Sequence, residues 1–129
     1  MGIDFDYAVE ISVSDKAGND LLNPANPNAF LEKDIKIFYL TNGVRKEFFE
    51  PNLDHPRNFY ITETNGKYIM HLAAFNETYI QWNENDADTL KAELNMTNGE
   101  QIKKLWYKGS LIWTWENWTK EGRRLDIVK

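Results

Sequence analysis

Tryptophan is the residue type in this chain with the clearest chemical use. Of the five tryptophans in 129 residues, four fall within the stretch KKLWYKGSLIWTWENW, residues 103–118. An indole ring on a protein surface can stack against the apolar face of a sugar ring, whereas a buried indole fills a core. The candidate rings for binding a ligand are Trp118, which starts a polar loop, Trp82 and Trp115. The tryptophans therefore predict either the core of a small β domain or an aromatic platform for a glycan.

Acidic loops offer a second kind of chemistry, because calcium prefers carboxylate and amide oxygens. The candidate ligands are Asp15, Asn19 and Asp20 in DKAGND, and Asn83, Asn85, Asp86 and Asp88 in NENDAD. Neither loop has the spaced acids and final glutamate of an EF-hand. Asp and Asn side chains in such turns usually bond their own backbone. We therefore predict no metal and no other cofactor.

Residues suited to catalysis are scarce. The chain has three serines, two histidines and no cysteine, which excludes a thiol nucleophile and cysteine-based zinc sites. Neither His55 nor His71 lies near Ser110 in the sequence, so a Ser–His–acid triad is not indicated. Paired carboxylates among the twenty acidic residues leave a small hydrolase as one alternative. The sequence predicts a protein that is not an enzyme.

Apolar and polar residues alternate with a period of two, which is typical of half-buried strands. The alternation is strict from Asp4 to Ser14. Segment 86–96 contains good helix formers, but its apolar residues alternate, which favours a strand. One helical turn is expected at 30–33. Further strands are predicted over residues 34–41, 58–63, 67–75, 78–82, 89–97, 101–108, 111–117 and 124–128.

Tight turns connect several of these segments. Thr-Asn-Gly occurs at 41–43, 64–66 and 97–99, and Asn-Gly tolerates the positive φ that short hairpin turns need. Short strands, tight turns and two long loops predict one all-β domain over residues 1–129. Its expected architecture is a two-sheet antiparallel sandwich of about eight strands, immunoglobulin-like or transthyretin-like.

The face that the clustered tryptophans occupy depends on the turn at 97–99. In a regular hairpin over 101–117, Trp106, Trp113 and Trp115 share one face. A two-residue turn places the apolar residues of 90–96 on the opposite face, so the tryptophans point to solvent. A three-residue loop places them on the same face, so the tryptophans lie in the core. The second register separates apolar from polar residues better, and we expect Trp106 and Trp113 in the core.

Charge and hydropathy exclude some partners. The net charge is −5 and no face is clearly basic, which argues against nucleic acid. No apolar run reaches the roughly 18 residues of a spanning helix. The first residues show neither the charged nor the apolar region of a signal peptide.

Four phrases, SDKAGNDLLNP, DIKIFYLTNG, DADTLKAEL and KLWYKGSLIW, together resemble small secreted lipoproteins of gut bacteria. In that group an acylated cysteine after a signal peptide is followed by a β-sandwich. The resemblance implies a bacterial cell-envelope or secreted location, with a lipid anchor in the full-length protein. It carries no functional residues to this chain. It favours a non-catalytic role in binding or assembly, with a glycan or another surface protein as partner. A carbohydrate-binding module is the alternative.

Overall fold

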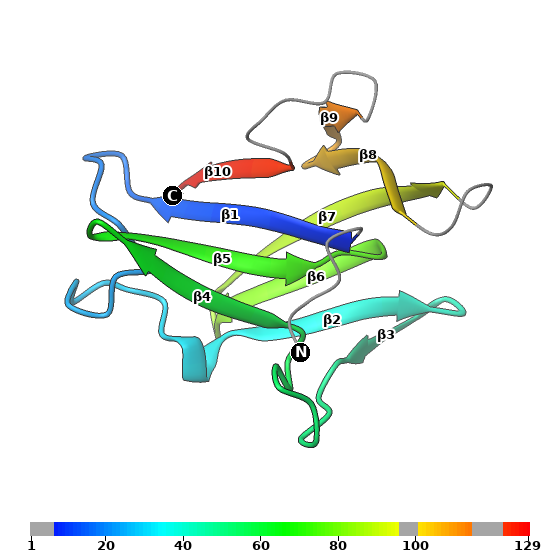
Figure 1. Ribbon diagram of the computed structural model, residues 1–129, viewed down its shortest axis with the longest axis horizontal. Coiled ribbons are helices and arrows are strands. Elements are labelled where there is room, and N and C mark those ends of the chain that lie inside the picture. The colour runs from blue at the N-terminus through cyan, green and yellow to red at the C-terminus, as the bar shows by residue number, and fades with distance from the viewer. Residues whose placement is uncertain (1–6, 96–100, 115–122) are drawn as a thin grey trace.

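The structure, a computed structural model, describes residues 7–95, 101–114 and 123–129. These residues form two β-sheets and one short 3₁₀ turn at Glu32–Asp34 (Figure 1). The four-stranded sheet has the order β10-β1-β5-β4, and the six-stranded sheet has the order β3-β2-β6-β7-β8-β9. The strands are β1 (Ala8–Ser14), β2 (Lys36–Thr41), β3 (Val44–Glu47), β4 (Phe59–Thr64), β5 (Lys67–Ala73), β6 (Asn76–Asn83), β7 (Asp86–Asn95), β8 (Gln101–Tyr107), β9 (Ser110–Thr114) and β10 (Arg124–Val128).

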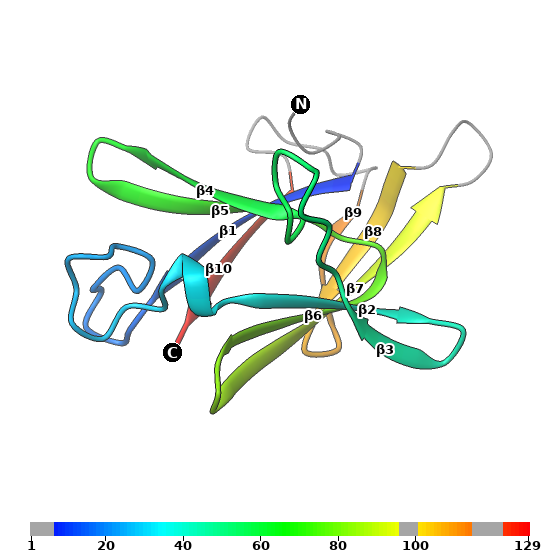
Figure 2. The same ribbon diagram turned by 90° about the horizontal axis from the view of Figure 1, so that it is seen from below.

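The predicted all-β, two-sheet sandwich is therefore confirmed, with ten strands in the described residues where about eight were expected. Segment 86–95 is a strand, as its alternation indicated. Seen from below in Figure 2, the β4–β5 and β2–β3 hairpins extend towards opposite sides of the molecule. The described residues contain no helix that is long enough and apolar enough to cross a bilayer.

The core forms where the apolar faces of the two sheets meet. In β1 every second residue is buried, and Val9 and Ile11 have no exposed surface. In β6 the same alternation buries Ile80 and Trp82 completely. The period-two pattern of the sequence thus becomes one inner and one outer face on each sheet. Removing the inner faces from water provides the main stabilisation of the fold.

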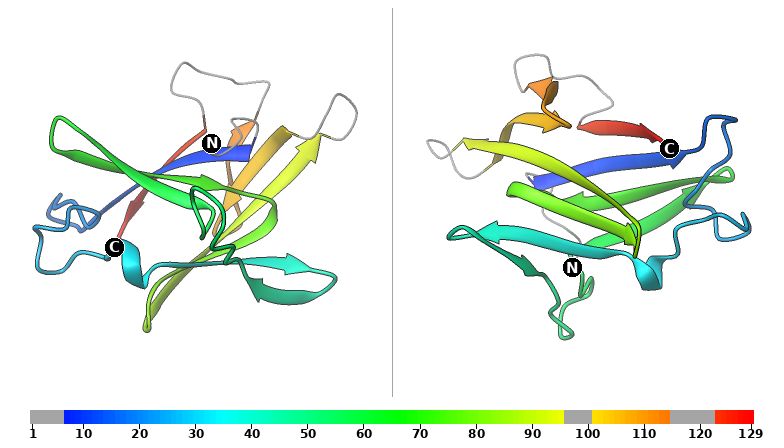
Figure 3. Two further views of the ribbon diagram at one scale, coloured as in Figure 1. Left: turned by 60° about the horizontal axis from the view of Figure 1, so that its bottom comes forward. Right: turned by 180° about the vertical axis from the view of Figure 1, so that it is seen from behind.

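Two features of the sheets were not predicted. Strand β3 pairs with β2 through an Asn42–Gly43 turn, and both turn residues have positive φ. All four residues of β3 are exposed, so the segment has no apolar alternation to reveal it. Strand β10 lies parallel to β1 at the edge of the four-stranded sheet, as both views in Figure 3 show. A parallel partner far along the chain has no local signal in the sequence.

One β-bulge separates the tryptophans of the β8–β9 hairpin, so the expectation that Trp106 and Trp113 share one face is wrong. Leu105 pairs with Trp113 but Trp106 pairs with Leu111, which leaves Ile112 as an extra residue in β9. A second register shift falls between Glu93 and the residue after it in the β7–β8 pair. Each extra residue reverses which face the following side chains occupy.

As a result, Trp113 is buried in the core with 8 % of its surface exposed. Trp106 lies on the outer face of the six-stranded sheet, beside Lys91 of β7. The prediction of a core position is therefore correct for Trp113 and wrong for Trp106. Trp115 and the turn at 97–99 lie outside the described residues.

Candidate functional site

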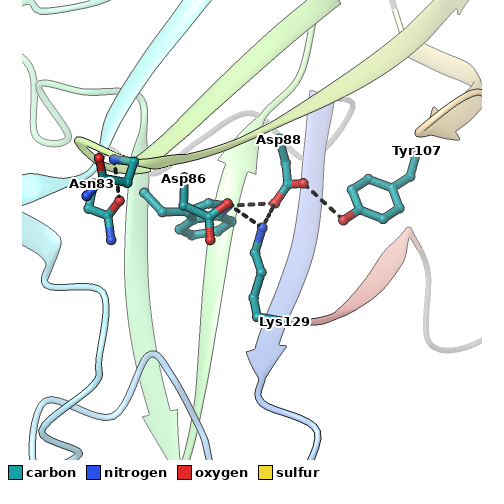
Figure 4. Close-up of polar contacts among 7 residues, drawn as sticks. Asn83, Asp86, Asp88, Tyr107 and Lys129 are labelled. Carbon is teal, nitrogen blue, oxygen red and sulfur yellow. Dashed lines mark hydrogen bonds and ion pairs between the residues drawn. The ribbon is translucent and has the colours of Figure 1, made fainter.

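The carboxylate of Asp88 on β7 is buried, with 5 % of the residue exposed. Its Oδ2 accepts hydrogen bonds from Trp82 Nε1 at 2.7 Å and from Lys129 Nζ at 2.6 Å. Its Oδ1 accepts a bond from the Tyr107 hydroxyl at 3.1 Å. Lys129 Nζ also bonds Asp86 Oδ1 at 2.9 Å, so the ammonium lies between two carboxylates (Figure 4). The network joins the six-stranded sheet to the residue that follows β10.

The electrostatics of this network keep both partners charged. Burial alone raises the pKa of Asp88, but the hydrogen bonds from Lys129, Trp82 and Tyr107 outweigh it and lower the pKa below its ordinary value. Burial lowers the pKa of Lys129, yet the two carboxylates raise it overall. Burial and the negative charge of Asp88 raise the pKa of Tyr107. At neutral pH the network is therefore an ionised pair with its hydrogen bonds satisfied, which is typical of a structural ion pair.

Trp82 is not a surface platform, so its assignment as an exposed stacking ring is wrong. Its ring has no exposed surface and stacks on Phe30, with 5.4 Å between ring centroids and 26° between planes. Its indole nitrogen is committed to Asp88. The sequence signal for its core position is the alternation of β6, because every second side chain of a strand lies on the same face. Trp82 therefore lies on the face of Thr78 and Ile80. Trp118, like Trp115, lies outside the described residues.

The first predicted calcium loop holds its own backbone together. Asp15 Oδ1 accepts bonds from the backbone nitrogens of Ala17 and Asn19, each at 2.9 Å, and Oδ2 accepts one from Asn19 Nδ2 at 3.0 Å. Asp20 accepts bonds from the backbone nitrogens of Leu22 at 2.9 Å and Tyr68 at 3.0 Å. These acids are engaged as turn and loop acceptors.

The second loop is engaged in the same way. Asn83 accepts a bond from the backbone nitrogen of Asn85 at 2.8 Å, and Asp86 and Asp88 hold Lys129. Across residues 7–95, 101–114 and 123–129, no three histidine or acidic side chains gather as a metal site would require.

A groove of about 430 Å³ lies on the outer face of the six-stranded sheet. It is lined by Glu77, Thr89, Lys91, Trp106, Lys108 and Gly109. The register sets this group side by side, because Glu77 pairs with Lys91 and Lys91 pairs with Trp106 across three neighbouring strands. The indole of Trp106 is partly exposed, and Lys91 Nζ lies 5.7 Å from its centroid.

A second aromatic residue occupies the same outer face. Tyr79 of β6 is partly exposed, and the guanidinium of Arg45 lies 3.8 Å from its ring centroid. The Tyr79 hydroxyl donates to Glu77 Oε2 at 2.8 Å, and this bond raises the pKa of Tyr79. Phe38 of β2 pairs with Tyr79 in the register. The face therefore carries three aromatic side chains among charged ones.

Sequence reasoning missed this groove as a unit. It recognised Trp106 but placed it in the core, and it did not single out Thr89, Lys91 or Lys108. The polar residues of β7 alternate with its buried Leu90 and Ala92, and this pattern assigns Thr89 and Lys91 to the outer face. The bulge that places Trp106 on the same face as these residues produces no such pattern in the sequence.

The outer face of the four-stranded sheet carries a different feature, a stack of three rings. Tyr60 lies between His55, at 4.4 Å between centroids, and His71, at 4.5 Å. His71 Nε2 and Thr62 Oγ1 are 2.8 Å apart. Burial lowers the pKa of His71, while the negative charge of Glu10 opposes that shift. The two imidazoles cover both faces of the tyrosine ring, so this stack leaves no tyrosine face for a ligand.

No protein-family model, no curated protein and no solved structure matches this chain. The immunoglobulin-like or transthyretin-like topology therefore stays a prediction, as does the lipoprotein resemblance.

Proposed function

We propose that this protein is a non-catalytic binding domain of the bacterial cell envelope or exterior, and that its ligand is a saccharide. The observation that carries the proposal is the partly exposed ring of Trp106, which lies in a groove among side chains that form hydrogen bonds. The carbohydrate-binding alternative thereby becomes the leading hypothesis, with Trp106 in place of Trp82 as the stacking ring.

The chemistry of the groove suits a sugar. A pyranose has an apolar face that packs on an indole and hydroxyl groups around its edge that need donors and acceptors. Trp106 supplies the flat apolar surface, Thr89 supplies a hydroxyl, and Glu77 supplies an acceptor. The lysines supply donors. Each of these side chains stands on a strand or a tight turn, which fixes its position better than a long loop would.

The shape of the face suits a chain rather than a single sugar. The groove is open along a sheet, and Tyr79 stands on β6 while Trp106 stands on β8, with β7 between them. Because neighbouring strands are about 4.8 Å apart, the backbones that carry the two rings are about 10 Å apart across the sheet. A ligand that touches both rings must therefore be longer than one sugar.

The acids favour binding over hydrolysis. A glycosidase needs one carboxylic acid with a raised pKa to protonate the leaving group. The buried Asp88 has a lowered pKa and shares the ammonium of Lys129 with Asp86. This pair is suited to holding strands together rather than to proton transfer.

Affinity electrophoresis against a panel of neutral and acidic polysaccharides tests the proposal. We expect retardation by at least one polymer, and an affinity about tenfold lower for Trp106→Ala, because an aromatic contact of about 1.4 kcal/mol corresponds to a factor of ten. Trp106→Phe should retain part of the affinity. Phe49→Ala is the matched control, since Phe49 is an exposed aromatic residue outside the groove, with 54 % of its surface accessible. The proposal fails if no polymer is bound or if Trp106→Ala binds like the wild type.

A further inference from the structure

Two lysines line the groove around Trp106, and within the described residues neither forms an ion pair with a carboxylate. Lys91 Nζ lies 5.7 Å from the Trp106 ring centroid, and Lys108 Nζ lies 5.4 Å from the centroid of Tyr107. Across the described part of the chain, ion pairs join Arg124 to Asp126 and Lys129 to its two aspartates, and neither groove lysine takes part in one. Both lysines are thus available to a negatively charged ligand.

The acid that lines the groove does not neutralise them. Glu77 pairs with Lys91 in the strand register but forms no ion pair with it. Its carboxylate instead accepts the hydrogen bond of Tyr79, whose ring lies against the guanidinium of Arg45. Arg45 is therefore a further cation near Glu77. The groove has an excess of positive charge in a chain whose net charge is −5.

Among the described residues, the charged pair beside the groove on the same face does not change this balance. Lys104 of β8 stands opposite Glu93 of β7 in the register, so that pair adds no net charge beside the groove. The excess is therefore local to the Trp106 ring, where a bound sugar would place its substituents.

On the basis of the proposed saccharide-binding function, we propose that the saccharide bound here is acidic. Its sugar ring stacks on Trp106, and its carboxylate or sulfate group is bound by the ammonium groups of Lys91 and Lys108. Lysine suits this role because its ammonium is a point charge on a flexible stem, which can follow an anionic substituent without a fixed bidentate geometry. When the sugar ring stacks on the indole of Trp106, the ammonium of Lys91 leaves the indole face and binds the acidic group of the sugar.

Binding measurements with three polymers test the proposal: polygalacturonate, which carries carboxylates, dextran sulfate, which carries sulfates, and neutral mannan. We expect an affinity for at least one acidic polymer about tenfold or more above that for mannan. Lys91→Gln and Lys108→Gln should each reduce that affinity about three- to tenfold. Raising the salt concentration to about 1 M, where the screening length falls to about 3 Å, should remove most of the preference. The two acidic polymers distinguish a carboxylate from a sulfate site.

Lys16→Gln is the matched control, because it removes the same charge from an exposed loop outside the groove. If Lys16→Gln weakens binding as much as Lys91→Gln, the attraction comes from overall charge and the acidic-site proposal is overturned. If Trp106→Ala abolishes binding but mannan binds as tightly as the acidic polymers, the saccharide function stands and the acidic proposal fails. If no polymer binds, both fail.

Discussion

At the scale of single residues, the two tryptophans separated by the β9 bulge should behave oppositely on truncation. Trp113 is 8 % exposed and packs on the inner face of the sheet, whereas Trp106 is partly exposed on the outer face. Removing a buried tryptophan side chain typically costs about 3–5 kcal/mol. We expect Trp113→Ala to lose that much unfolding free energy and Trp106→Ala to lose about 1 kcal/mol or less, because surface changes are small. Urea unfolding followed by circular dichroism measures both. Equal losses would contradict the assignment of the two rings to opposite faces.

Asp88 makes the other sharp prediction for a single residue. Asp88→Asn keeps the shape of the side chain but removes the charge that Lys129 and the two aromatic donors bind. Removing one partner of a buried ion pair typically costs about 3–5 kcal/mol. Asp126→Asn is the control, because Asp126 is exposed and pairs with Arg124 at 3.2 Å on the surface. A surface pair contributes about 0–1 kcal/mol. The stability ranking by chemical denaturation should be wild type, then Asp126→Asn, then Asp88→Asn well below. If Asp88→Asn matches Asp126→Asn, the network does not stabilise the fold.

The sequence could identify the chemistry of these residues better than their partners. Asp88 was visible as an acid in a turn-rich loop, but its cation is Lys129, which follows it by 41 residues. No local pattern joins residues so far apart. Trp82 could have been placed in the core, because it shares parity with buried Ile80. Trp106 could not have been placed on the outer face, because an extra residue in a strand leaves no mark on composition.

At the scale of elements, the β8–β9 turn is built with one residue that fits it and one that does not. Lys108 and Gly109 have φ of +50° and +80°. Both positions of a two-residue hairpin turn of this type need positive φ, and asparagine and glycine adopt it most readily. The turns at Asn42–Gly43 and Asn65–Gly66 follow that preference. Lys108 is the exception, and it is also one of the residues that line the groove. The turn therefore carries a strained residue at a proposed binding site, a pattern typical of functional sites.

Lys108→Asn should separate these two roles. Asparagine adopts the left-handed conformation with less strain, so we expect the unfolding free energy to rise by roughly 0.5–1 kcal/mol. The same change removes an ammonium from the groove, so the affinity for an acidic polymer should fall about three- to tenfold. Thermal melting and affinity electrophoresis of one variant measure both. Gly109→Ala is a control with the opposite expected effect on stability, because it should destabilise the turn. A Lys108→Asn variant that melts at a lower temperature than the wild type would contradict the inference that the backbone of Lys108 is strained.

The elements themselves were predictable where one face of a strand is buried. In β1 and β7 the alternation of apolar and polar residues records the difference between core and solvent. Strand β3 is exposed on both faces, so nothing in VRKE distinguishes it from a loop. Its charges suit an edge strand, because they disfavour pairing with another chain. The pairing of β10 with β1 could not be predicted, because strand order depends on contacts across the whole chain.

At the scale of the whole molecule, polar contacts tie the two sheets together at two places. On one side Lys129, after β10, bonds Asp88 of β7. On the other, the Tyr39 hydroxyl of β2 donates to the Ala73 carbonyl of β5 at 2.5 Å and accepts from Asn58 Nδ2 at 3.0 Å. Both links cross an otherwise apolar interface, where an unpaired polar group would be costly. They fix how one sheet lies on the other, which apolar packing alone specifies less strictly.

The charged link makes the stability of the whole fold depend on pH in a definite direction. The pKa of Asp88 is held below its ordinary value of 3.8 in the folded state, so below about pH 4 the unfolded chain binds the proton more readily. The stability from this group is therefore present above pH 4 and is lost as the pH falls through the folded pKa. The pKa of Lys129 is raised above 10.5, so its contribution is present below that pH and is lost as the pH rises through the folded pKa.

Urea unfolding at intervals between pH 3 and pH 11 should consequently give a plateau with an acid and an alkaline limb. Asp88→Asn should lower the plateau and flatten the acid limb. Some slope should persist, because the pKa of Asp126 is lowered by the hydrogen bond from Ser12. Asp126→Asn should leave the plateau almost unchanged. If wild type and Asp88→Asn lose stability in parallel between pH 5 and pH 3, the carboxylate between the sheets does not govern the acid stability of this fold.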